Sequence, residues 1–119
     1  PGASEVLSSS YVTYSNESKI KEIGVPADII ERFGAVSAET AEAMASGAKK
    51  RSGADIAVSV TGFAGPDSDP GYEAGDAYIG YAFGDIKGHM EIHTNRDFRN
   101  WNRRYFVLRM LRAVYLLIR

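Results

Sequence analysis

A chain of 119 residues with 45% hydrophobic content has the length of one domain and enough apolar surface for one core. Its 14 basic and 15 acidic residues give a net charge of -1, which does not favour nucleic acid or an anionic membrane as a partner. The chain has no cysteine, and this excludes disulfides, thiolate catalysis and cysteine-ligated zinc. Because it shows neither a signal peptide nor about 18 consecutive uncharged apolar residues, we expect a soluble, cytoplasmic protein.

The first half of the chain predicts one strand and several helices. Tyr11–Tyr14 is aromatic and β-branched, which favours a strand. Each of the next segments opens with a residue that caps or starts a helix and ends at a glycine. We therefore predict helices over residues 16–23, 27–33 and 38–52.

The second half predicts a sheet. Asp55–Thr61 is a short apolar run typical of a buried strand, and the long loop Gly62–Gly75 follows it. Apolar side chains on both faces of residues 76–83 predict an interior strand. A hairpin connects it to residues 89–94, where apolar and polar side chains alternate. The two histidines of this last strand lie on one face but far apart, so we expect no metal site there.

The C-terminal segment predicts a helix from about Asp97 to the end of the chain. Residues 105–118 are apolar almost all the way round, so we expect a further packing element or a partner subunit to cover them. Arginines precede this apolar run and recur through it: Arg99, Arg103, Arg104, Arg109, Arg112 and Arg119. They form either a solvated or interface face, or an anion site for a phosphate, for which Arg103 is the best candidate.

The end of the strand at Thr61 is a candidate binding site. Thr61 is followed by Gly62–Pro66, a stretch of glycine, alanine and proline with one phenylalanine. Ligands of open α/β sheets bind at the carboxyl ends of strands, where small residues let the backbone approach closely. The alternative is that glycine and proline only end the strand.

A second candidate is the start of the first helix. Tyr14, Ser15, Asn16 and Lys19 converge where the predicted strand ends and the helix begins. A lysine held at this position can have a lowered pKa and serve as a base. The alternative is an ordinary helix cap beside a solvent-exposed lysine.

The motifs taken together resemble a known family. Val12–Lys19, Gly34–Ser37, Gly53–Asp55 and Thr61–Pro66 are similar, in order and spacing, to the C-terminal domain of the competence/damage-inducible protein CinA. The resemblance covers residues 1–83 well and the tail more loosely. It implies a three-layer α/β/α domain with a central mixed sheet. This family includes the stand-alone nicotinamide-nucleotide amidohydrolases.

The resemblance implies a reaction and a set of site residues. The family hydrolyses the carboxamide of nicotinamide mononucleotide to nicotinate mononucleotide and ammonia, with a serine nucleophile and a lysine base. By resemblance Lys19 is the base, Tyr14 lines the site and Thr61 belongs to the opposite wall. We expect substrate contacts from Ser15, Asn16, Gly62, Phe63, Ala64, Gly65, Arg99 and Arg103. Neither a cofactor nor a metal is implied, and the expected partner is the small-molecule pyridine nucleotide.

The chain also departs from the family pattern. The family's serine lies in a segment Thr-Ala-Glu-Ser-Cys-Thr-Gly-Gly, which is absent here. Asp67–Tyr72 replaces the usual glycine pair of the loop. We expect residues 1–119 to form one domain that lacks its N-terminal helix, is inactive alone, and associates with itself as a homo-oligomer or with the missing segment. The alternative function is a non-catalytic domain that binds a nucleotide or a protein.

Overall fold

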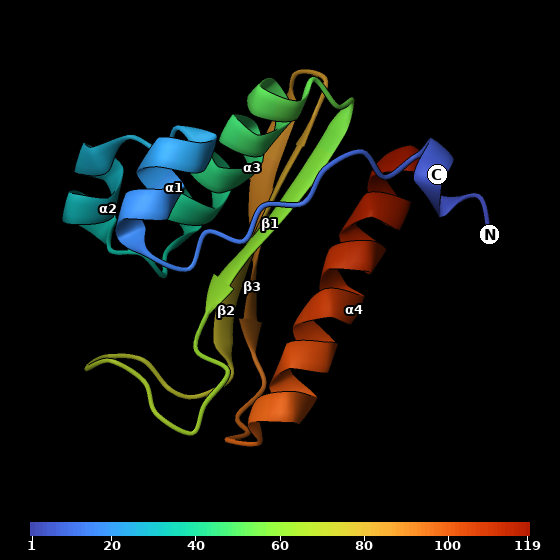
Figure 1. Ribbon diagram of the computed structural model, residues 1–119. Helices are drawn as coiled ribbons and strands as arrows, with labels where there is room; N and C mark the ends of the chain where they lie inside the picture. Colours follow the sequence, from blue (N-terminus) through green and yellow to red (C-terminus); the bar gives the residue numbers. More distant parts are fainter.

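The computed structural model describes residues 1–119, in which three antiparallel strands separate two layers of helices (Figure 1). After a short 3-10 helix at Ala3–Glu5, the helices of one layer follow in succession. They are α1 (Asn16–Ile23), α2 (Ala27–Phe33) and α3 (Ala38–Ser52). The other layer is α4 (Arg99–Ile118). The predicted three-layer α/β/α architecture is confirmed.

Local capping explains where the helices of the first layer begin and end. The Ser15 hydroxyl accepts from the amide of Ser18, and the Ser18 hydroxyl accepts from the amide of Ser15, which makes a capping box. Ser37 caps α3 in the same way, through the amide of Thr40. Gly24, after α1, has a φ of 68°, a left-handed conformation that glycine adopts without strain. All three predicted helices are confirmed.

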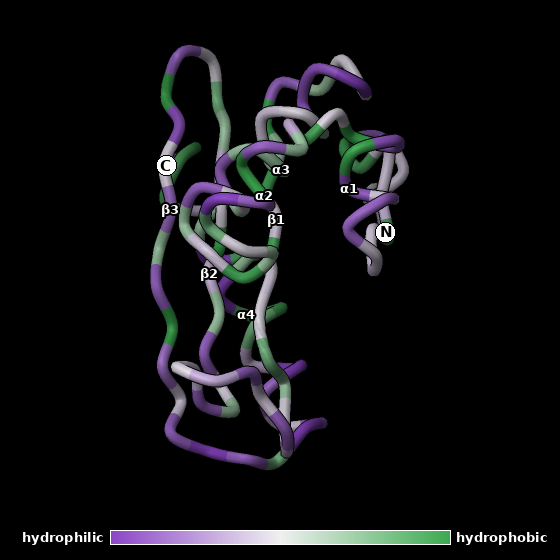
Figure 2. Tube along the Cα trace, turned by 90° about the vertical axis from the view of Figure 1, so that its left-hand side faces the viewer, coloured by the Kyte–Doolittle hydropathy of each residue, from purple (hydrophilic) through white to green (hydrophobic).

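The sheet contains β1 (Ile56–Gly62), β2 (Asp76–Phe83) and β3 (Ile86–His93), in the order β1-β2-β3. Both neighbouring pairs are antiparallel, with Val60 opposite Ile79 and Ile79 opposite Met90. Figure 2 shows β3 alternating between hydrophilic and hydrophobic residues, as predicted. This alternation leaves one face of β3 against the core and the other in solvent.

The predicted strand at Tyr11–Tyr14 is wrong, and with it the expectation of a mixed sheet. These residues form no ladder with β1, and the side chains of Val12 and Tyr14 are exposed. The carbonyl oxygens of Thr13 and Tyr14 accept hydrogen bonds from the side chain of Lys19 instead of from a neighbouring strand. The sheet is therefore antiparallel throughout.

The chain has two apolar clusters, one between layers and one within the layer of α1, α2 and α3. One lies between the sheet and α4 and contains Ile79, Ile92 and Phe106. The other joins α1, α2 and α3 through Ile23, Ile30 and Met44. On this side of the sheet the small residues of α3 allow a close approach, and the Ser59 hydroxyl donates to the Ala41 carbonyl at 2.6 Å. The expected close packing of α3 on the sheet is confirmed.

None of the helices combines the length and the apolar character that crossing a bilayer requires.

Candidate functional site

Lys19 lies one turn into α1 and is buried, with 6% of its surface exposed. Its Nζ donates to the carbonyl oxygen of Thr13 at 2.6 Å and lies 3.5 Å from that of Tyr14. No carboxylate pairs with it, because every ion pair in the structure involves a histidine. Desolvation lowers the pKa of Lys19 below its usual value of 10.5. The alternative of a solvent-exposed lysine is wrong.

The burial of Lys19 favours the neutral form of its amine over the charged form. A neutral NH₂ group has two N–H bonds, and the carbonyl oxygens of Thr13 and Tyr14 lie within reach of both. Its lone pair then remains free to accept a proton. An ammonium group buried here would carry its charge with no opposite charge beside it.

The residues predicted around Lys19 are mainly at the surface. Tyr14 is exposed and contributes only its carbonyl oxygen to the lysine. Ser15 and Asn16 are exposed at the start of α1, and the Ser15 hydroxyl is used in the capping box. The hydroxyl of Ser18 donates to the Ser15 carbonyl at 2.8 Å. Neither serine hydrogen-bonds to Lys19.

The strand end at Thr61 is packed against the loop that follows α2. Thr61 is buried, and its hydroxyl donates to the carbonyl oxygen of Ala35 at 2.6 Å. The next residue, Gly62, leaves no room for a Cβ atom beside Ala77. Phe63 continues the pairing with β2, since its amide donates to the carbonyl oxygen of Asp76 at 2.8 Å. The amide of Phe63 is therefore not available to a ligand.

The next two residues differ from Phe63 in this respect. The N–H groups of Ala64 and Gly65 donate no hydrogen bond within the chain. Their carbonyl oxygens are both occupied, that of Ala64 by Asn102 at 2.8 Å and that of Gly65 by the guanidinium of Arg99 at 3.0 Å. The loop is thus held by its carbonyl oxygens while two adjacent amides remain unoccupied donors.

Asn102 holds this arrangement together through three hydrogen bonds, and it was not among the residues predicted from the sequence. It is fully buried and uses its amide group three times. Its Nδ2 donates to the carbonyl oxygens of Ala64 and Arg96, both at 2.8 Å, and its Oδ1 accepts from the Thr94 hydroxyl at 2.7 Å. Asn102 lies one helical turn before the buried Phe106, and a polar residue in line with the core positions of α4 was the signal that could have identified it.

The two candidate arginines occupy different positions. Arg99 binds the loop carbonyl of Gly65, whereas Arg103 is exposed and makes no hydrogen bond or ion pair. The structure therefore brings Arg99 together with Ala64 and Gly65. No hydrogen bond joins this group to Lys19.

A polar cluster on the open part of the sheet was also not predicted. Tyr78 is paired with Thr61 on one side and with Glu91 on the other, so all three lie in one row across the sheet. Next to this row, His93 Nδ1 lies 2.8 Å from Asp76 Oδ1, and this hydrogen bond raises the pKa of His93. Burial and the Glu91 carboxylate raise the pKa of Tyr78. Strand alternation predicts the wet face, but the neighbours across it depend on register.

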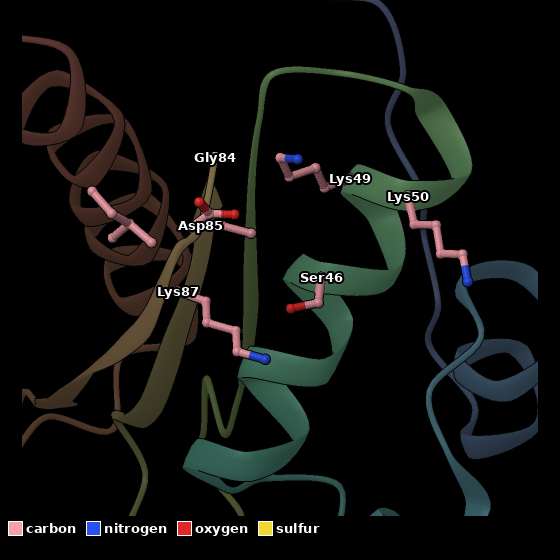
Figure 3. Close-up of a pocket in the computed structure, with 8 residues that line it drawn as sticks. Ser46, Lys49, Lys50, Gly84, Asp85 and Lys87 are labelled. Carbon is pink, nitrogen blue, oxygen red and sulfur yellow. The ribbon is translucent and has the colours of Figure 1, made fainter.

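A separate shallow cavity of about 290 Å³ lies between the C-terminal half of α3 and the β2–β3 hairpin (Figure 3). Lys49, Lys50 and Lys87 line it together with Ser46 and Asp85. It contains none of the candidate site residues.

Comparisons with known sequences all point to one protein family. The family model described as the CinA C-terminal domain matches residues 1–118. A competence-damage inducible protein of Caldicellulosiruptor saccharolyticus is 52% identical over 101 residues, which are 82% of this chain and 24% of that protein. One of Clostridium novyi is 42% identical over 113 residues, 93% of this chain and 27% of that protein. The chain spans about a quarter of the length of these curated relatives.

Solved structures agree. The competence/damage inducible protein CihA of Agrobacterium tumefaciens matches with a TM-score of 0.85 and 33% identity, over 90% of this chain and 66% of that chain. The competence damage-inducible protein A of Klebsiella pneumoniae matches with a TM-score of 0.80 and 28% identity, over 86% of this chain and 63% of that one. The chain therefore belongs to the CinA C-terminal domain family.

Proposed function

We propose that this chain supplies the base and one wall of the pocket of a cytoplasmic amidohydrolase that converts nicotinamide mononucleotide to nicotinate mononucleotide and ammonia. The observation that carries the proposal is Lys19. It is buried, has no carboxylate partner, and its Nζ contacts the backbone carbonyl oxygens of Thr13 and Tyr14. Lowering the pKa of a lysine raises the fraction of its amine that is neutral and able to take a proton at physiological pH.

The lysine would serve both halves of the reaction. Nζ takes the proton of a serine hydroxyl while the serine oxygen attacks the carboxamide carbon. The protonated amine then gives this proton to the leaving nitrogen, ammonia departs, and an ester of the serine remains. Lys19 next takes a proton from water, which attacks the ester, and returns it to the serine oxygen. The net reaction is amide plus water to carboxylic acid and ammonia.

The loop after β1 supports the same chemistry. The tetrahedral intermediate carries an oxyanion, which requires N–H donors that are not already used. Ala64 and Gly65 offer two such amides, whereas the amide of Phe63 is bonded to Asp76. We assign the substrate's 5′-phosphate to Arg103, since the guanidinium of Arg99 is engaged by the Gly65 carbonyl.

A second candidate function is a non-catalytic domain that binds a nucleotide, and a different observation favours it. No serine hydroxyl hydrogen-bonds to Lys19, and both Ser15 and Ser18 are used in the cap of α1. A domain of this kind can bind a nucleotide without hydrolysing it. We therefore expect the 119-residue chain alone to release no ammonia.

The test compares Lys19→Met with Lys21→Met, which removes an exposed lysine of the same helix. Ammonia release from nicotinamide mononucleotide is measured for the chain and for the full-length product of its gene, and binding is measured by calorimetry. We expect the full-length product to be active, with a loss of at least about a thousandfold on Lys19→Met and little change on Lys21→Met.

Two outcomes contradict the amidohydrolase proposal. Full activity of Lys19→Met would show that another group is the base. Nucleotide binding without ammonia release by the full-length product would favour the non-catalytic domain.

A further inference from the structure

Two consecutive peptide groups of the loop after β1 are each held by a different part of the chain. The carbonyl oxygen of Phe63 accepts from the amide of Gly75 at 2.7 Å. The next carbonyl oxygen, that of Ala64, accepts from the side-chain Nδ2 of Asn102 at 2.8 Å. Figure 1 shows the start of α4, which carries Asn102, at the same end of the sheet as this loop. Both bonds hold a carbonyl group and leave the N–H of the same peptide group unused.

The planarity of the peptide group turns these bonds into a statement about the N–H groups. The peptide bonds that precede Ala64 and Gly65 are trans, and in a trans peptide the C=O and the N–H point in opposite directions. The N–H of Gly65 shares its peptide group with the carbonyl of Ala64, so it points away from Asn102. The N–H of Ala64 shares its group with the carbonyl of Phe63 and depends on Gly75 instead. The two donors therefore have separate supports.

The side chain of Asn102 is itself fixed. It is fully buried, and the two N–H bonds of Nδ2 are used by the carbonyl oxygens of Ala64 and Arg96, both at 2.8 Å. Its Oδ1 accepts from the Thr94 hydroxyl at 2.7 Å. A carbonyl oxygen only accepts, so a flipped side-chain amide would set oxygen against oxygen at two places. Asn102 thus transmits the position of the segment after β3 to the loop.

We propose that Asn102 is a positioning residue of the amidohydrolase reaction, which orients the N–H of Gly65 toward the oxyanion of the tetrahedral intermediate. This inference rests on the proposed function. An oxyanion donor is effective when it is already aimed at the place where the charge develops. Because Asn102 is fully buried, it acts through the peptide group between Ala64 and Gly65 and not by touching the substrate.

The kinetic test replaces Asn102 by leucine, which has nearly the same shape and cannot make the three hydrogen bonds. Ammonia release from nicotinamide mononucleotide is measured with the full-length product of the gene. We expect kcat to fall by at least about tenfold while KM stays within about twofold, because the oxyanion exists only after the attack on the carboxamide.

A matched control separates positioning from a general loss of stability. Gly80→Ala disturbs the packing of β2 on Ala41 of α3 and does not touch the loop after β1. We expect its kcat to stay within about twofold of the unchanged protein at a temperature where the variant is folded. Equal decreases in kcat for Asn102→Leu and Gly80→Ala would show that Asn102 has only a structural role.

A second pair of variants applies if Asn102→Leu does not fold. Thr94→Val removes the hydroxyl that holds Oδ1 of Asn102 but leaves the bond to Ala64 in place. We expect a smaller decrease in kcat, of about threefold or more. Thr94→Ser retains the hydroxyl and should retain kcat. The same kcat for the valine and serine variants would contradict the proposal.

The orientation of the N–H groups can be measured without any activity. Residual dipolar couplings of the 119-residue chain, labelled with ¹⁵N, report the direction of each N–H bond. Asn102→Leu should change the coupling of Gly65 and leave that of Ala64 nearly unchanged, because Gly75 still holds the peptide group of Ala64. Asn100→Ala, at an exposed position of the same helical turn, should leave both couplings unchanged.

The outcomes distinguish this inference from the proposed function. An unchanged kcat of Asn102→Leu, in a product that Lys19→Met inactivates, would overturn the role of Asn102 and leave the proposed function standing. An unchanged coupling of Gly65 would overturn that role whatever the activity. A full-length product that releases no ammonia would contradict the proposed function, and with it the catalytic part of this inference.

Discussion

Asn102, in the first turn of α4, donates its side-chain N–H to the carbonyl oxygen of Ala64, 38 residues earlier in the chain, at 2.8 Å. The same side chain also binds Arg96 and Thr94, so one amide group joins α4, the segment after β3 and the loop after β1. With Ala64 and Gly65 held through their carbonyl oxygens, their N–H groups have a defined position. A single buried residue thus shapes the wall of the candidate site.

Asn102→Ala is expected to lower the free energy of unfolding by about 2–4 kcal/mol, because it leaves buried polar groups of the loop and of Thr94 without partners. Asn100→Ala, at an exposed position of the same turn, is expected to cost less than about 0.5 kcal/mol. Urea unfolding at neutral pH measures both. An equal decrease in the free energy of unfolding for the two variants would show that the hydrogen bonds of Asn102 do not stabilise the fold.

Lys19 is expected to titrate below the usual lysine value of 10.5, because burial desolvates its amine. The free energy of unfolding should rise with pH between the lowered pKa of Lys19 and 10.5, where the unfolded chain holds a proton that the folded chain has lost. Carbon NMR of the lysine ε-methylene groups, with the Lys19 signal assigned by its loss in Lys19→Met, measures the pKa of Lys19. An unshifted Lys19 would remove the basis of the proposed catalytic role.

Asp76→Asn is expected to lower the pKa of His93, because the hydrogen bond to the Asp76 carboxylate is the main cause that raises it. Glu91, whose Oε1 lies 4.0 Å from His93 Nε2, and Glu73 raise this pKa further. A raised histidine pKa stabilises the folded chain below about pH 6.5, and this contribution is lost as the pH rises through the folded-state pKa.

The Asp76→Asn variant should therefore lose stability at pH 5.5 and lose less at pH 8.5. The side chain of His93 is 55% exposed, so the difference is expected to stay below about 1 kcal/mol. Proton NMR of the histidine ring and thermal unfolding at the two pH values check the prediction. A loss that is the same at both values would contradict it.

Gly80→Ala is expected to destabilise the chain by about 1–3 kcal/mol, because the added methyl group would overlap the carbonyl group of Ala41 on α3. Gly88→Ala is the matched control, since its methyl group would meet the end of the Tyr81 side chain, which can move. Urea unfolding should show a smaller decrease in the free energy of unfolding for Gly88→Ala than for Gly80→Ala. The opposite order would mean that α3 can shift away from the sheet.

The helices could be predicted from the sequence because their signals are local. Ser15 and Ser37 bind amides three residues later, and Gly24 needs only its own backbone conformation to end α1. The strand predicted at Tyr11–Tyr14 failed for the opposite reason. Strand propensity becomes a strand only where another strand offers hydrogen bonds, and here Lys19 binds the carbonyl oxygens.

The site was only partly predictable. Lys19, Thr61 and the loop after it were identified as candidates, but the burial of Lys19 depends on how the preceding segment folds over α1. The role of Asn102 depends on contacts with residues 38 positions away, which no local pattern records. The exposed side of α4 could be expected, because a helix that is apolar all round has more surface than one sheet face covers.

The strand order has a consequence for handling the protein. β3 is the edge strand that carries charges, with Lys87 and Glu91 exposed, whereas β1 is an edge strand without a single charged residue or proline. Charged residues and prolines are what prevent an edge strand from pairing with a strand of another molecule. Aggregation at high protein concentration is therefore expected to begin at β1. Replacing a solvent-facing residue of β1 by lysine should suppress this aggregation.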